Sequence, residues 1–122
     1  MAVIHGVVID CAEPKRLAEF WSEVLGYEYR MDDDDWCSLR RPGGGAPFLS
    51  FQKVPEGKVV KNRVHLDIRP DGDTLEEEQE HLEHLGATTL RFLDKGKWSH
   101  YIMADPEGNE FCLLSPEHAT VT

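Results

Sequence analysis

The sequence has little of several features that mark common classes of protein. Its 122 residues contain three cysteines, an odd number. None has the CxxC spacing of a redox or metal motif, so we expect reduced thiols in a cytoplasmic protein. No apolar run approaches the roughly 20 residues that a membrane-spanning helix needs. The N-terminus has no basic segment followed by a long apolar one, so we expect no signal peptide.

Basic residues are also scarce, since 13 lysines and arginines face 23 acidic residues and give a net charge of −10. A surface of this sign repels phosphate backbones and argues against nucleic acid as a partner, while it weakly favours a cationic ligand. The run Asp32 to Asp35 carries much of the acidity. Adjacent carboxylates repel one another and point in different directions, so the run predicts a solvated loop between strands rather than a metal site.

What the sequence does contain is one order of elements, strand–helix–strand–strand–strand, written twice. The length suits a single domain, 1–122, with one module at about 1–55 and a second at about 62–116. Alternating apolar residues predict the strands, and apolar residues at helical spacing predict the helices. The expected strands are 3–10, 27–31, 36–41, 47–54, 63–69, 88–93, 98–104 and 110–114, and the expected helices are 13–26 and 74–86.

The ends of the two helices carry clear signals. Pro14 suits the first turn of the first helix, and Thr74 with Glu77 predicts a capping box at the start of the second. Gly26 and Gly86 lie just past the last turns, where a left-handed backbone is needed. These two glycines are 60 residues apart, which is the first sign of a duplication.

The same spacing recurs along the strands. Residue pairs 60 positions apart include His5 with His65, Leu25 with Leu85, Phe51 with Phe111, and Gln52 with Cys112. We expect Ile4 and Val8 on the sheet face beneath the first helix, because helices cover an apolar face. Strand alternation places a polar set on the opposite face: His5, Gln52, His65 and Cys112, with Ser50, Asp67, Arg69 and Glu110 two residues along.

Each of these residues has two interpretations. A single strand histidine is usually packed or solvated, but two at equivalent repeat positions favour a shared site. Cys112 is either a thiolate ligand or a small buried apolar residue. Gln52 either contacts a ligand or hydrogen-bonds a neighbour. Trp98 and His100 either line a cavity or pack in the core.

Three segments resemble the vicinal oxygen chelate superfamily, which includes glyoxalase I, bleomycin-resistance proteins and extradiol dioxygenases. They are "FWSEVLGY" on the first helix, "VHLDI" opening the second module, and "DPEGNEFCLL" near the end. The resemblance covers nearly the whole chain. It implies an α+β fold in which two βαβββ modules form a cupped mixed sheet with the helices on its outer face. The modules pair within one chain or between two chains, and a homodimer is the assembly most often implied.

In metal-dependent relatives, each module supplies one ligand from its first strand and one from its last. Carried over by position, these are His5, Gln52, His65 and Cys112. The resemblance therefore implies at most one divalent ion, with zinc, nickel, manganese and iron(II) as the candidates. Glutamate is usual at the two last-strand positions, and the amide of Gln52 cannot serve as a base. We therefore expect no typical glyoxalase I activity.

Two functions stay open from the sequence. In the first, the chain is a metal-dependent lyase, isomerase or dioxygenase that acts on a small oxygen-bearing molecule. Its ligands to the metal are then His5, His65 and Cys112, and Glu110 or Asp67 moves protons. The residues that contact the small molecule are then Gln52, Ser50, Trp98 and His100. In the second, the chain is not an enzyme, and a metal-free pocket sequesters the small molecule.

Overall fold

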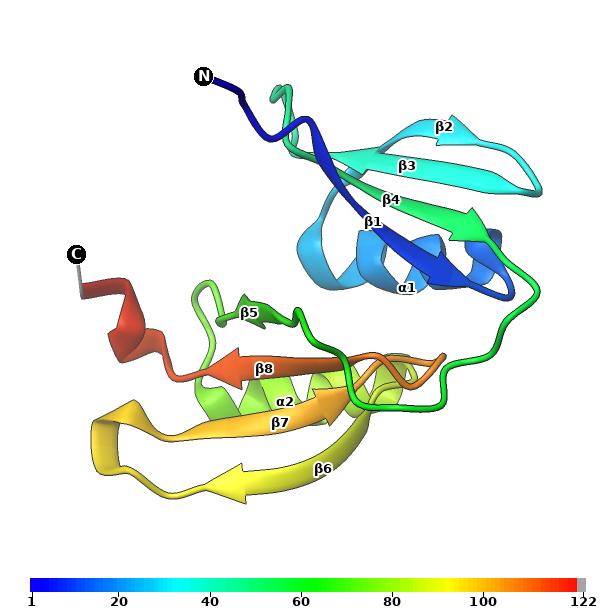
Figure 1. Cartoon of the computed structure of the whole chain (residues 1–122). Coiled ribbons are helices and arrows are strands. Elements are labelled where there is room, and N and C mark those ends of the chain that lie inside the picture. Colours follow the sequence, from blue (N-terminus) through cyan, green and yellow to red (C-terminus); the bar gives the residue numbers. More distant parts are fainter. Residues whose placement is uncertain (121–122) are drawn as a thin grey trace. The chain divides into compact units, whose positions relative to one another are not determined.

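The computed structural model describes residues 1–120, so the last two positions of the expected 1–122 domain lie outside the described residues. The chain divides into two compact units, Met1–Val59 and the residues from Val60 onward. Each unit contains one α-helix and one four-stranded sheet (Figure 1). The expected βαβββ order occurs twice and the fold is α+β, as the sequence predicted. None of the helices among the described residues is long and apolar enough to cross a membrane.

Unit 1 begins with a strand that pairs in parallel with the last strand of the same unit. Its elements are β1 (Gly6–Cys11), α1 (Pro14–Leu25), β2 (Glu28–Asp32), β3 (Trp36–Arg40) and β4 (Phe48–Lys53). The strand order is β1-β4-β3-β2, in which only the β1–β4 pair is parallel. The helix between β1 and β2 is the crossover that leaves room for this parallel pair.

Unit 2 repeats this topology and adds two short 3-10 helices. Its elements are β5 (Leu66–Ile68), α2 (Leu75–Leu85), β6 (Thr88–Leu93), η1 (Gly96–Trp98), β7 (His100–Ala104), β8 (Glu110–Leu114) and η2 (Pro116–Thr120). The strand order is β5-β8-β7-β6, and β5 is parallel to β8. Both sheets are therefore mixed, as expected.

The predicted helix ends are confirmed. Pro14 occupies the first turn of α1, and the Thr74–Glu77 capping box is complete at the start of α2. Gly26 (φ 68°) and Gly86 (φ 119°) both adopt the left-handed conformation just past the last turns. A side chain at either position would be strained, which explains why glycine stands there.

Each helix covers one face of its own sheet and forms a core with it. In unit 1 the buried apolar residues are Cys11, Leu17, Ala18, Phe20, Trp21, Cys37, Leu39, Leu49 and Phe51, and in unit 2 they are Leu75, Leu82, Ala87, Met103, Ala104, Phe111 and Leu113. A large apolar side chain stabilises the fold by about 1.5–3 kcal/mol when it is fully buried. The opposite face of each sheet is left for other contacts, and most of the candidate site residues lie on or beside it.

Three expectations near the strand ends are wrong. The expected strand 63–69 is shortened to β5, so His65 lies just before it, and His5 likewise precedes β1. The expected strand 98–104 begins only at His100, because Trp98 belongs to η1.

The expectation for Val8 and Ile4 is also wrong. Val8 pairs with Ser50, on the face away from α1, and Ile4 and Val8 line a cavity there. The cause is that His5 precedes the strand, so alternation counted from His5 does not carry into β1.

Candidate functional site

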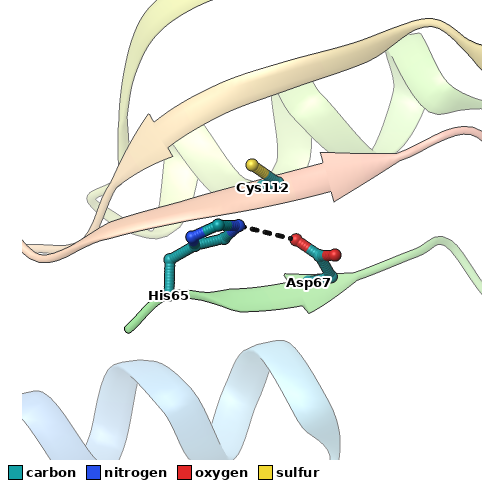
Figure 2. Close-up of side chains that lie close together, drawn as sticks. All are labelled: His65, Asp67 and Cys112. Carbon is teal, nitrogen blue, oxygen red and sulfur yellow. Dashed lines mark ion pairs between the residues drawn. The ribbon is translucent and has the colours of Figure 1, made fainter. Parts of the chain in front are cut away.

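The face of the unit 2 sheet away from α2 brings three donor side chains together. Asp67 and Cys112 are register partners on the parallel strands β5 and β8, and His65 lies two residues before Asp67. The imidazole Nε2 of His65 is 3.3 Å from Oδ1 of Asp67. One potential ligand atom from each of the three residues lies within 4.8 Å of the others. Figure 2 shows the imidazole and the carboxylate facing each other beside Cys112.

This cluster is the one group of three potential metal ligands within residues 1–120. The aspartate run Asp32 to Asp35 does not form such a group, and Lys15 instead places its ammonium 3.2 Å from Asp32. Asp33 to Asp35 form the predicted loop between β2 and β3, whereas Asp32 is the last residue of β2.

The environment of Cys112 keeps its thiol protonated. Burial raises its pKa most, and the charge of Asp67 and a hydrogen bond with that carboxylate raise it further. The neutral thiol is therefore the form present near pH 7 without a cation. A bound metal ion has to displace this proton, and its positive charge favours that displacement.

Two further predicted residues share this face of the unit 2 sheet. Glu110 alternates with Cys112 along β8, and its Oε2 accepts a hydrogen bond from the backbone N–H of Asn62 at 3.2 Å. His100 opens β7 opposite Leu114, which also alternates with Cys112. The structure thus places Glu110 and His100 on the sheet face that carries the His65–Asp67–Cys112 cluster.

Trp98 lies apart from that face. Its ring packs edge-on against His118 with the ring centroids 5.1 Å apart, and the ammonium of Lys97 lies 5.0 Å from its centre. These contacts make Trp98 part of the packing between η1 and η2.

In unit 1 the structure does not bring His5 and Gln52 together. Gly6 pairs with Phe48, so the position opposite His5 is Pro47, and Gln52 lies five residues further along. At about 3.3 Å per residue this is roughly 16 Å of strand. In unit 2 the corresponding separation between His65 and Cys112 is only two residues. Leu66 pairs with Phe111, so His65 lies opposite Glu110, and Cys112 is two residues further along β8.

The constant 60-residue offset fails at the last strand of each module. Each unit has a β-bulge in its second strand. The bulge in β2 lies between Tyr29 and Met31, where β2 pairs with β3, and the bulge in β6 lies 60 residues later, between Thr89 and Arg91, where β6 pairs with β7. The residues that lie beside one another across three neighbouring strands can be followed from these bulges. In unit 1 they are Tyr29, Leu39 and Leu49, and in unit 2 they are Thr89, Met103 and Phe111.

Leu49 therefore matches Phe111, and Ser50 occupies the place of Cys112. The expectation that Gln52 and Cys112 are equivalent is wrong. The expectation that His5 and His65 are equivalent is wrong as well, because Val7 pairs with Leu49 and Leu66 pairs with Phe111, so Gly6 occupies the place of His65. The loops between strands differ in length between the modules, so one offset cannot hold throughout.

The face of the unit 1 sheet away from α1 carries a cavity of about 470 Å³. It is lined by Ile4, His5, Gly6, Val8, Arg30, Met31, Trp36 and Ser50. Sequence reasoning singled out His5 and Ser50 but missed Arg30 and Met31. Regular alternation sends these two neighbours to opposite faces, and no residue of the segment signals the bulge that brings both to one face. The grouping of His5, Gln52, His65 and Cys112 in one cup joins residues of two units and stays a prediction.

Comparison with known families now adds to this geometry. The family model of the glyoxalase-like domain matches residues 6–114. The chain belongs to the glyoxalase-like domain family. This places it in the glyoxalase, bleomycin-resistance and dioxygenase superfamily that the three sequence segments resemble. No curated protein matches the chain.

Several solved structures share the fold. A glyoxalase/bleomycin resistance protein/dioxygenase family enzyme from Burkholderia phytofirmans PsJN is 18% identical, with a TM-score of 0.73 over 93% of this chain and 98% of that one. Protein ATC0852 from Agrobacterium tumefaciens is 16% identical, with a TM-score of 0.75 over 94% and 98%. The fosfomycin resistance protein FosX from Mesorhizobium loti is 10% identical, with a TM-score of 0.70 over 93% and 91%. At these identities the likeness concerns the fold alone.

Proposed function

We propose that this glyoxalase-like protein binds one divalent metal ion through His65, Asp67 and Cys112 and uses it to hold a small oxygen-bearing molecule. The observation that carries the proposal is the convergence of an imidazole, a carboxylate and a thiol on one face of the unit 2 sheet. Imidazole and thiolate suit zinc and related borderline ions, and a carboxylate completes a common ligand set. Three protein ligands leave a fourth position for the small molecule.

The donor set also defines the class of chemistry. When bound, the ion would supply a Lewis acid that polarises an oxygen of the small molecule, as in metal-dependent lyases and isomerases. Glu110 is the carboxylate that we assign to proton transfer, because Asp67 belongs to the cluster. The hydrogen bond from Asn62 orients the Glu110 carboxylate on the same sheet face. Glyoxalase I activity is excluded from the proposal, since Ser50 and Cys112 stand at the equivalent last-strand positions where a glutamate base is usual.

Thermal unfolding of untagged protein tests the metal site. Zinc, nickel, manganese or iron(II) should raise the melting temperature, because an ion that binds only the folded state stabilises it. A concentration 100 times Kd adds about 2.7 kcal/mol. His65→Ala and Cys112→Ser should each remove most of this shift, since the remaining two donors cannot fill the coordination of the ion. His84→Ala is the matched control, because His84 is an exposed histidine on α2.

Two results would count against this site. A shift that survives both His65→Ala and Cys112→Ser places the ion elsewhere, for example at the run Asp32 to Asp35. No shift with any of the four ions removes the metal from the proposal altogether. The metal-dependent rise in melting temperature of His5→Ala is a separate measurement. It tests the expectation that His5 also binds the ion, which depends on how the two units meet.

The second candidate function is metal-free sequestration of a small molecule. The observation in its favour is the unit 1 cavity, whose volume of about 470 Å³ falls in the range of ligand pockets. Apolar side chains form much of its wall, as is usual where a protein binds a small organic molecule. This function is preferred if no divalent ion stabilises the protein.

We further propose that the protein works as a homodimer in the cytoplasm. Support for the dimer comes from the family, and support for the location comes from three cysteines that are all free in the described chain. Sedimentation of the purified protein measures the assembly directly, and a monomer at every concentration would contradict it.

A further inference from the structure

The unit 1 cavity holds a positive charge in a chain that is acidic overall. Arg30 lines this cavity together with His5, and its remaining wall is formed by apolar side chains, glycine and Ser50. Within the described residues, no aspartate or glutamate lines it. Arg30 forms no ion pair with any other residue of the described range 1–120, whereas Arg16 and Arg40 of the same unit pair with Glu13 and Glu28.

The guanidinium of Arg30 is held in place by neutral groups. Its Nη1 donates to the hydroxyl of Ser38 at 2.9 Å, and this hydroxyl is 2.9 Å from that of Ser50. Its central carbon lies 4.1 Å above the ring of Phe48. A guanidinium carries five N–H donors, so one hydrogen bond and one stacking contact leave donors for a further partner.

The β-bulge in β2 is what directs Arg30 to this place. The pairing with β3 shifts between Tyr29 and Met31, so Arg30 is the extra residue. Both Arg30 and Met31 then line the cavity, although neighbouring residues of a regular strand point to opposite faces. Bulges that re-aim a side chain are common beside binding sites. The equivalent bulge in unit 2 has Leu90 at the position of Arg30, and its arginine, Arg91, stands at the position of Met31.

We propose that the unit 1 cavity binds a small organic anion whose carboxylate pairs with Arg30 and whose apolar part lies against Ile4, Val8, Met31 and Trp36. An arginine fork matches a carboxylate in shape and charge. The net charge of −10 predicts a cationic ligand instead, but charges more than about 8 Å away are screened at physiological ionic strength. The local charge of the cavity therefore decides the sign of the ligand.

This inference names a ligand class for the unit 1 cavity and does not depend on the metal site of unit 2. It is tested by calorimetry in the presence of a chelator, with three probes that share one ring and differ in charge. Phenylacetate should bind, phenylacetamide should bind at least tenfold more weakly, and phenethylamine should bind most weakly of the three. Affinity for phenylacetate should fall as salt is added.

Substitutions then assign the binding to Arg30. Arg30→Gln should weaken phenylacetate binding by about tenfold to a hundredfold, the usual range for loss of a charge-assisted hydrogen bond. Arg30→Lys should recover only part of it, because lysine keeps the charge but not the planar fork. Arg40→Gln is the matched control, since it removes the same charge from unit 1 outside the cavity.

A second variant keeps the inference testable if Arg30→Gln fails to fold. Met31→Glu retains Arg30 and adds a carboxylate to the same wall, at a residue that is 41% exposed. It should reverse the preference from phenylacetate to phenethylamine. Equal binding of phenylacetate and phenylacetamide, no binding of any probe, or an unchanged affinity in Arg30→Gln would each overturn the inference. If phenylacetate binds but none of the four ions raises the melting temperature of the parent protein, the metal proposal alone is overturned.

Discussion

At the scale of single residues, the three cysteines show how position sets the chemistry of a thiol. Cys112 is half-buried beside Asp67 and is the one that we assign to a metal. Cys37 is fully buried in the unit 1 core, and its Sγ lies 3.5 Å from Oδ1 of Asp32. Burial raises the pKa of Cys37 to about 11, and the hydrogen bond and charge of Asp32 add to the effect. The folded protein therefore keeps this proton at a pH where an exposed thiol has lost it.

A prediction follows for stability at high pH. Between pH 9 and pH 11 the unfolded chain loses the Cys37 proton while the folded chain retains it. The free energy of unfolding should therefore fall as the pH rises, by about 3 kcal/mol at most from this group. Cys37→Ala should be less stable near pH 7, where a cavity remains, but should lose less stability on going to pH 11. Denaturant unfolding at several pH values measures both, and equal pH dependence in the two proteins would contradict the assignment.

At the scale of elements, the two helices start in different ways. The capping box of α2 pairs Thr74 and Glu77 reciprocally, with N–H to oxygen distances of 3.0 and 3.1 Å. These bonds lower the pKa of Glu77, because they favour its ionised carboxylate. Glu13 precedes α1 and makes no side-chain capping bond, and the helix begins instead at Pro14. The first helix therefore depends more on the burial of Leu17, Phe20 and Trp21 than on its cap.

This difference predicts unequal effects of cap removal. Thr74→Ala should destabilise unit 2 by about 1 kcal/mol, because it leaves the backbone N–H of Glu77 without its acceptor. Glu13→Ala should change the stability of unit 1 much less, since no capping bond is lost. Chemical denaturation of the two variants beside the parent protein makes the comparison. If Glu13→Ala lowers the free energy of unfolding more than Thr74→Ala does, the capping hydrogen bonds do not determine the contribution of each cap to stability.

The same scale shows what the sequence could and could not predict. Helices, caps and the βαβββ order were predictable, because apolar periodicity and residues such as Gly26 and Thr74 act locally. The β-bulge at Arg30 was not, because a bulge depends on how two strands pair and leaves no mark in a short segment. The match of Ser50 with Cys112 was missed for the same reason, since it depends on loop lengths between paired strands. The residues that the structure brings together in unit 2 were among those singled out from the sequence, because Asp67 and Cys112 pair directly and His65 lies two residues before Asp67.

At the scale of the whole molecule, the chain consists of two units and the segment that joins them. Residues 54–65 form no helix or strand, and most of their side chains are exposed. The segment contains Lys58, Lys61 and Arg63, so it offers three sites for trypsin. Its far end is anchored, because the backbone N–H of Asn62 donates to Glu110. Cleavage by a protease needs a stretch of backbone that can leave its hydrogen bonds, and exposed loops supply it most readily.

We therefore expect limited trypsin digestion to cut first after Lys58 and to yield fragments 1–58 and 59–122. The bond after Lys61 should be cut more slowly, because binding of the protease has to break the contact between Asn62 and Glu110. Glu110→Ala removes that contact and should speed the cut after Lys61. Mass spectrometry of early time points identifies each bond. A first cut after Lys95 or Lys97, in the segment between β6 and β7, would show that the segment joining the units is better protected than its exposure indicates.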